Sequence, residues 1–167
     1  LVHVLPLAAV VALDGQAQHV HPQAPQRALV AAAHRDLLQP EHALPLLRSV
    51  LAGGQHPDAS IHLGIALANS GEPLQAIEVY ERYLVEHPDH GGHAVVLSNI
   101  GGCLSTLGRT EEAEQYHRRA IALDPEQGGP RWNLMANLFK QGRLDEALAV
   151  IAEAAALPFH TPQTRAD

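Results

Sequence analysis

Histidine is the residue type with the most obvious capacity for chemistry in this chain, because 12 of the 167 residues are histidines. His87, His90 and His93 stand three residues apart, and imidazoles at that spacing can share a metal ion on a helix or in a compact turn. The same segment contains a proline and two adjacent glycines, which oppose a helix, and it contains no cysteine. We therefore interpret the three histidines as solvated side chains of a polar loop, and we expect no bound metal and no cofactor.

Nucleophilic catalysis requires a nucleophile, a base and an orienting group at one place. No serine of the chain stands in the glycine-flanked context that exposes a nucleophile at a strand-to-helix turn. Cys103, the single cysteine, lies beside two glycines in an apolar segment, where we expect a small buried residue rather than a reactive thiol. The glycine pairs at 53–54, 91–92 and 128–129 fall in predicted turns between repeats, and no glycine-rich phosphate-binding loop is present in the sequence. The sequence therefore predicts a protein that is not an enzyme.

Composition narrows the choice of partners. The formal net charge of −7 argues against nucleic acid, whose binding depends on clustered Lys and Arg. No segment approaches the roughly 18–20 consecutive apolar residues that span a bilayer, so no membrane partner is expected. A hydrophobic content of 46% with only 4% aromatic residues favours helices rich in alanine and leucine. Lys140 is the only lysine beside ten arginines, which we attribute to a GC-rich genome; we expect a bacterial, cytoplasmic protein.

Two stretches of the sequence repeat each other at a spacing of 34 residues. Identical or similar residues recur at eight positions: Asn99, Ile100, Leu104, Gly108, Arg109, Glu112, Ala113 and Ala120 match Asn133, Leu134, Leu138, Gly142, Arg143, Glu146, Ala147 and Ala154. A further copy lies 37 residues before the first of these, and a weaker one 33 residues earlier still. A fixed period of this length is typical of stacked units that bury their apolar faces against one another.

Each copy has the pattern of two helices joined by a tight turn. Leu134, Met135 and Leu138 follow helical spacing, and Gly142 is placed to end that helix in a left-handed conformation. Small residues recur where the paired helices must approach closely: Gly64, Ala76, Gly101, Ala113 and Ala147. Glu114, on the second helix of its copy, is expected to be exposed, so that its replacement by Ala changes stability little.

The pattern closely resembles the tetratricopeptide repeat, whose signature combines a Leu-Gly pair, aromatic positions, an alanine and a closing proline. The resemblance implies an all-α fold, a right-handed α-solenoid of helix–turn–helix repeats. Several signature positions differ here; His117, for example, stands where an aromatic is expected. In the weakest copy Pro45 falls inside the second helix, where we expect it to cause a kink.

The repeats divide the chain into three parts. An apolar segment and linker occupy residues 1–23, the solenoid occupies 24–161, and a tail occupies 162–167. Within the solenoid we expect a degenerate repeat at 24–56 and better ones at 57–90, 94–127 and 128–161. Residues 1–13 are apolar but lack a basic leader, so we interpret them as a segment that packs against the solenoid or belongs to a preceding element rather than as a signal peptide.

In the family that this sequence resembles, the first helix of each unit lines a concave groove that takes a peptide or a partner helix. The candidate groove residues are those that helical spacing places on this face: Arg35, Ile61, Ile65, Asn69, Ser98, Asn99, Trp132, Asn133, Phe139 and Lys140. An exposed Trp132–Phe139 pair favours a ligand or assembly contact, the alternative being burial under the C-terminal tail. Asn99 and Asn133 could hold a ligand backbone through paired donor and acceptor contacts, or serve repeat packing instead.

These features predict a non-enzymatic module that binds a protein or an extended peptide segment in the groove. Family members that clamp a chaperone's terminal carboxylate use several basic residues, whereas this face offers only Arg35 and Lys140, far apart along the solenoid. Recognition of a C-terminal acidic motif is therefore not expected. Two alternatives stay open: a scaffold that forms homo-oligomers through its apolar C-terminal end, and an accessory domain of a larger enzyme.

Overall fold

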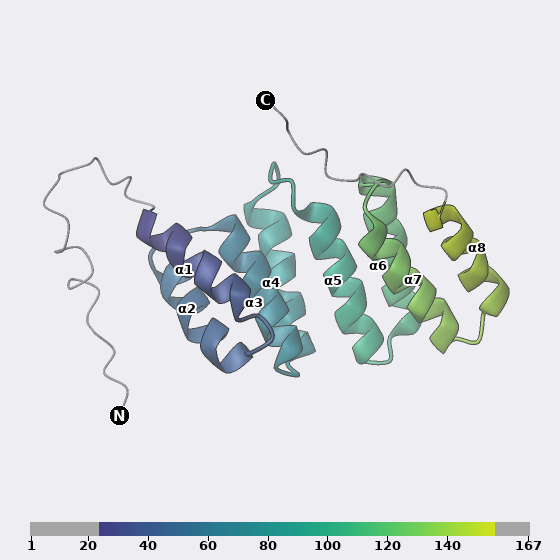
Figure 1. Ribbon diagram of the computed structural model, residues 1–167, viewed down its shortest axis with the longest axis horizontal. Coiled ribbons are helices and arrows are strands. Elements are labelled where there is room, and N and C mark those ends of the chain that lie inside the picture. Colours follow the sequence, from purple (N-terminus) through teal and green to yellow (C-terminus); the bar gives the residue numbers. More distant parts are fainter. Residues whose placement is uncertain (1–23, 156–167) are drawn as a thin grey trace, which may run out of the picture.

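The computed structural model describes residues 24–155, and these form eight α-helices with no strand among them (Figure 1). The helices follow one another along the chain: α1 (Ala24–Arg35), α2 (Pro40–Ala52), α3 (Pro57–Asn69), α4 (Pro73–Glu86), α5 (His93–Thr106), α6 (Thr110–Leu123), α7 (Gly128–Lys140) and α8 (Leu144–Ala155). The expected all-α solenoid is confirmed. The segments 1–23 and 162–167 and the last six residues of the predicted final repeat lie outside the described residues, and the repeat boundaries remain a prediction.

Proline and glycine set the ends of the helices. Pro57 and Pro73 each occupy the first position of a helix, where the missing N–H costs no internal hydrogen bond. Gly71, Gly108 and Gly142 follow α3, α5 and α7 with φ of +82°, +78° and +73°. After each glycine the next residue donates its N–H to a carbonyl five residues back, at 2.9–3.1 Å. This is the Schellman cap, which requires the left-handed conformation that glycine adopts most readily, and it confirms the predicted role of Gly142.

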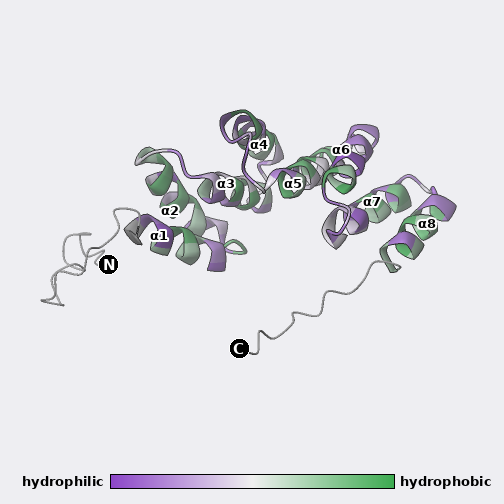
Figure 2. Cartoon of the chain, turned by 90° about the horizontal axis from the view of Figure 1, so that it is seen from above, coloured by the Kyte–Doolittle hydropathy of each residue, from purple (hydrophilic) through white to green (hydrophobic). Residues whose placement is uncertain are grey.

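The odd-numbered helices line one side of the solenoid. α1 contacts α3, α3 contacts α5 and α5 contacts α7, whereas the even-numbered helices contact only their neighbours in sequence. Figure 2 shows α1, α3, α5 and α7 along the inner side of a bent row, with α2, α4 and α6 outside it. The first helix of each unit therefore faces the concave side, as the resemblance implied.

Small residues let the helices of a pair approach. A Cβ atom added at Gly64 would overlap the ring of Tyr80, and one added at Gly101 would overlap the ring of His117. The alanines of the second helices, Ala76, Ala113 and Ala147, are all 0% exposed. These sites have no room for a larger side chain.

The buried apolar residues form three clusters. One joins α1, α2 and α3, a second joins α3 to α6, and a third is centred on α7 and α8. Leu44 and Leu63 pack against both of the first two clusters, whereas no residue is common to the second and third. In the third cluster Ile121 is the contribution from α6.

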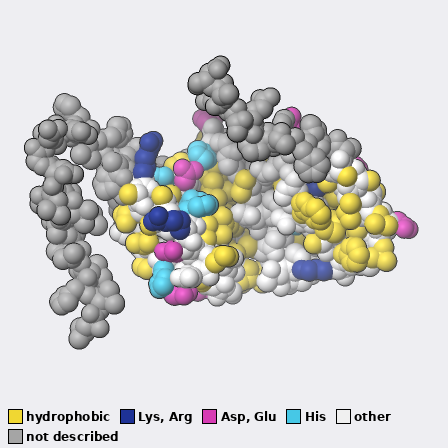
Figure 3. Space-filling view, viewed as in Figure 1, with side chains coloured by type: hydrophobic (Ala, Val, Ile, Leu, Met, Phe, Trp, Pro, Cys, Tyr) yellow, Lys and Arg dark blue, Asp and Glu magenta, His cyan; other side chains and the backbone are white. Residues whose placement is uncertain are grey.

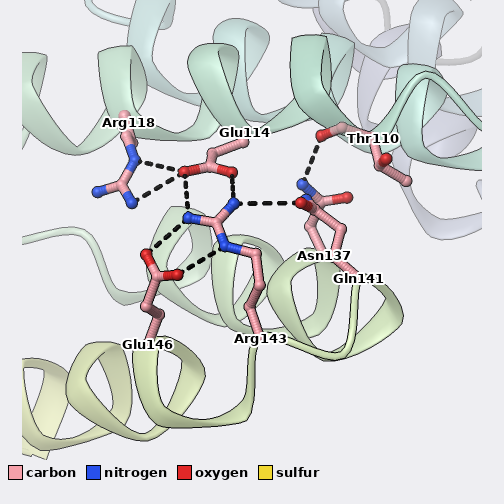
Figure 4. Close-up of polar contacts among 7 residues, drawn as sticks. All are labelled: Thr110, Glu114, Arg118, Asn137, Gln141, Arg143 and Glu146. Carbon is pink, nitrogen blue, oxygen red and sulfur yellow. Dashed lines mark hydrogen bonds and ion pairs between the residues drawn. The ribbon is translucent and has the colours of Figure 1, made fainter.

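Polar side chains join the last helix pair to the rest, and they correct the expectation for Glu114 (Figure 4). The Glu114 side chain is only 14% exposed and pairs with Arg143 at 2.5 Å and with Arg118 at 2.9 Å. Burial raises the pKa of Glu114, but the hydrogen bonds from the two arginines outweigh it and hold the pKa below its ordinary value. Arg143 also pairs with Glu146 of α8, so one guanidinium bridges two helices. Glu114 is therefore a partner in an inter-repeat contact and not a free surface residue.

Pro45 lies inside a helix, as expected, and the kink at this residue stays a prediction. This helix, α2, continues past Pro45 to Ala52. The residue sits near the beginning of the helix, where the absence of one N–H removes only a single bond to the first turn. The proline therefore does not end the helix.

Candidate peptide-binding groove

A cavity of about 300 Å³ opens between α3, α5 and α7 on the concave side. Half of the sequence-predicted groove residues line it: Ile65, Asn69, Ser98, Asn99 and Asn133. They come from three successive first helices, because the repeat spacing brings equivalent turns of these helices side by side. The structure thus brings together a set that is mostly polar amides and hydroxyls.

The side-chain amides of this groove differ in the hydrogen bonds that they already make within the protein. Asn133 donates from Nδ2 to the hydroxyl of buried Ser98 at 3.0 Å, and Asn69 donates from Nδ2 to the Leu37 carbonyl at 2.8 Å. Asn99 is half-buried and lies near the Tyr80 hydroxyl, but its Nδ2 completes no hydrogen bond of ordinary geometry with any residue of the range 24–155. Burial raises the pKa of Tyr80, so this hydroxyl stays protonated. The Asn99 side chain lines the open cavity, where an amide can pair with the backbone of a bound peptide.

The aromatic pair lies further along the same side. Trp132 and Phe139 of α7 are 58% and 54% exposed, and Lys140 donates from Nζ to Ser105 at 3.1 Å. Figure 3 shows the apolar side chains gathered over α7 and α8, beyond a paler polar middle. The pair is separate from the 300 Å³ cavity but belongs to the helix that supplies Asn133.

Two predicted groove residues take other positions. Ile61 is only 9% exposed and packs in the core with Tyr83 and Val96, under the turn at Gly92. Arg35 is exposed near the end of α1 and lines no part of the groove cavity. Tyr80 and Thr106, which sequence reasoning did not select, do line it.

The three histidines at the junction of α4 and α5 pack around a tyrosine instead of forming a solvated loop. The rings of His87, His90 and His93 surround Tyr83 with centroid distances of 5.3, 5.8 and 5.7 Å. Tyr83 Oη and His90 Nδ1 lie 2.5 Å apart, and the Nε2 atoms of the other two histidines are buried. Burial raises the pKa of Tyr83. Within the described part of the chain, no three His, Cys, Asp or Glu side chains are placed to hold a metal ion.

Cys103 is buried, as expected, and burial raises the pKa of its thiol to about 11. A thiol of this kind is almost entirely protonated at neutral pH and is a poor nucleophile. None of the eight described helices is both long and apolar enough to cross a bilayer.

Comparison with known proteins places these features in a family. No curated protein matches the chain. Among solved structures, PilF of Pseudomonas aeruginosa matches with a TM-score of 0.66 at 26% identity, covering 79% of this chain and 60% of that one. The crystal structure of MamA matches with a TM-score of 0.64 at 18% identity, covering 78% and 76%. The second repeat domain of Spaghetti (RPAP3), bound to the HSP90 peptide SRMEEVD, matches with a TM-score of 0.54 at 23% identity, covering 62% and 94%.

Two family models, both described as tetratricopeptide repeat, match residues 56–126 and 104–163. Repeats of this kind are typically non-catalytic protein-interaction modules, which supports protein or peptide partners in general terms. The two matches overlap and together extend over more than half of the sequence, in the same helix pairs that carry the Schellman caps and the small-residue contacts. The chain belongs to the tetratricopeptide repeat family.

Proposed function

We propose that this protein binds an extended peptide segment of a partner in the concave groove between α3, α5 and α7. The observation that carries the proposal is the convergence of Asn69, Ser98, Asn99 and Asn133 on one open cavity of about 300 Å³. Amide and hydroxyl groups can pair with the N–H and C=O groups of a peptide backbone regardless of its sequence. The groove residues therefore supply general affinity for an extended chain.

Selectivity would come from the exposed aromatic pair at the end of the groove. Trp132 and Phe139 could receive large apolar side chains of the ligand, and buried aromatic anchors of this kind dominate the energy of many interfaces. The peptide bound to the RPAP3 domain supports a peptide as the type of ligand, although that domain is only 23% identical. We propose a non-catalytic role throughout.

The test is capture of partners by immobilised protein from a native extract, with groove variants compared side by side. Changing Asn99 and Asn133 together to Ala should reduce capture strongly while the far-UV circular dichroism spectrum stays helical. Changing Gln75 to Ala is the matched control and should leave capture unchanged, because Gln75 is an exposed residue of α4 that does not line the groove cavity. Capture that is equal in the two variants would contradict groove binding.

A second function is favoured by the apolar surface of the last helix pair. Leu144 and Leu148 of α8 are 50% and 59% exposed, close in sequence to the aromatic pair of α7. A scaffold that self-associates through this end would cover them. Light scattering over a concentration series should then show dimers that Leu148→Glu dissociates; a monomer at all concentrations contradicts self-assembly. The bacterial source, the cytoplasmic location and the accessory-domain alternative remain predictions from sequence.

A further inference from the structure

A second and larger cavity, of about 690 Å³, opens between α1, the beginning of α3 and the turn before α5. It shares no lining residue with the groove cavity. Its ionisable lining consists of four histidines, one arginine and one aspartate: His34, His56, His62, His90, Arg27 and Asp58. In Figure 3 cyan, dark blue and magenta side chains gather over α1 and α3, at the opposite end from the apolar patch.

The two histidines from α1 and α3 face each other closely. His34 Nδ1 and His62 Nε2 lie 3.1 Å apart, and their ring centroids are 4.7 Å apart. The hydrogen bond between them needs a lone pair on one ring, so it cannot survive when both imidazoles are protonated. The Nδ1 atom of His62 is buried and bonds to no described residue. Protonation would thus leave two cations in contact, a state that an entering anion stabilises.

The remaining charges of the cavity set the sign of its field. Asp58 lies 3.6 Å from His90 and is the only carboxylate in the lining, whereas Arg27 forms no ion pair with any residue in the described portion. At neutral pH the arginine and the aspartate balance one another. Protonation of the imidazoles makes the cavity cationic within a chain whose formal net charge is −7.

The environment of His62 makes its protonation depend on a ligand. Burial lowers the pKa of His62, and the neighbouring His34 lowers it further. Asp58 acts in the opposite direction, and His56 again lowers the pKa. A second negative charge in the cavity would act as Asp58 does, so anion binding and protonation reinforce one another.

We propose that this histidine-lined cavity is a binding site for a polycarboxylate, occupied in mildly acidic conditions and released near neutral pH. Each imidazolium N–H donates one charge-assisted hydrogen bond to a carboxylate oxygen. A phosphate ligand is less well matched, because a single arginine provides no bidentate cluster. The carboxylates can belong to a small acid or to consecutive acidic side chains of a peptide, and the site does not depend on occupation of the groove.

The test is isothermal titration calorimetry of the full chain at pH 5.5 and pH 7.5 with two probes, tartrate and N-acetylated tri-glutamate. The carboxyl groups of both probes are largely ionised at both pH values, so a change in affinity reports protonation of the protein. Affinity should be about 10-fold higher at pH 5.5 than at pH 7.5, since one linked proton changes the binding constant up to 10-fold per pH unit. Tighter tri-glutamate binding identifies an acidic segment as the source, and tighter tartrate binding identifies a small acid.

Three variants test whether the histidine-lined cavity is the carboxylate-binding site. Replacing His34 and His62 together by Gln should abolish the gain in affinity at pH 5.5, with the helical spectrum unchanged. His42→Gln is the matched control, because His42 is an exposed histidine of α2 outside the cavity. Asn99→Ala should leave the binding of tartrate, which has no peptide backbone, unchanged, which separates this site from the peptide groove. The proposal is overturned if affinity is equal at the two pH values, if His42→Gln reduces it as much as the double variant does, or if Zn²⁺ binds at pH 7.5 while neither carboxylate probe binds.

Discussion

His117 should make the stability of the solenoid sensitive to acid. Its side chain is 1% exposed, lies on α6 against Gly101 of α5, and its Nδ1 has no hydrogen-bond partner among residues 24–155. Burial lowers the pKa of His117 from 6.5 to about 4, and no charged neighbour contributes to this shift. The His117 imidazole is therefore protonated less readily in the folded protein than in the unfolded chain.

The depressed pKa fixes the direction and range of the effect. The unfolded chain binds the proton near pH 6.5 and the folded chain only near pH 4, so stability is complete above pH 6.5 and is lost as the pH falls towards 4. A difference of one pKa unit corresponds to about 1.4 kcal/mol, which gives a total loss of about 3 kcal/mol. About 2 kcal/mol of it is reached at pH 5. The His117 side chain is nearly fully buried, so solvent screening reduces this loss of stability only slightly.

Urea unfolding followed by far-UV circular dichroism at pH 8 and pH 5 would measure the effect. His117→Phe restores the aromatic type expected at this position and removes the titrating group. Its free energy of unfolding should fall by about 2 kcal/mol less than that of the wild type between the two pH values. The other ionisable groups are the same in both proteins, so their effects on the free energy of unfolding cancel in the comparison. The exposed-site variant His42→Gln should behave as the wild type. An equal pH-dependent loss in wild type and His117→Phe would refute the assignment.

Three further outcomes are expected. Ala113→Leu and Ala147→Leu should each lower the free energy of unfolding by about 1–3 kcal/mol, because both sites are fully buried at a close helix contact; unchanged urea midpoints would contradict this. Glu114→Ala should lower the melting temperature more than Glu112→Ala, since the Glu112 side chain is 50% exposed and pairs only within its own helix turn, and equal shifts in scanning calorimetry would show that the inter-repeat contact contributes nothing. The thiol of Cys103 should react with a disulfide reagent at pH 8 only after unfolding in urea, because burial raises its pKa to about 11; rapid labelling of the native protein would contradict that.

The sequence was sufficient for the fold because its evidence is local. Helical spacing, the glycine that ends each first helix and the small residues at close contacts all recur within one repeat, and the structure confirms them at Gly142, Gly64 and Gly101. The second helix of the weakest repeat also continues through Pro45, as the repeat pattern predicts. Stacking then follows from the period alone.

The site was only partly predictable, because its contacts join different repeats. Ile61 has the helical spacing of a groove residue. However, Gly92 has no side chain, and this leaves room for the Ile61 side chain to pack in the core. Glu114 and Arg143 are 29 residues apart, and His34 and His62 are 28 apart. The sequence pattern of a single repeat does not predict either pair, because each pair depends on the side-chain rotamers of two neighbouring repeats. The polar groove was found because its asparagines and serine lie on the predicted faces of successive first helices.

The separation of the apolar clusters affects which helices unfold together. The cluster of α7 and α8 shares no core residue with the cluster of α3 to α6, and the contacts that join the two parts include Ile121 and the polar pairs Glu114–Arg143 and Asn133–Ser98. Ion pairs weaken with added salt, whereas apolar packing does not. The last helix pair should therefore behave as a separate cooperative unit whose amide hydrogens exchange faster as ionic strength rises, while those of α3 to α6 stay protected.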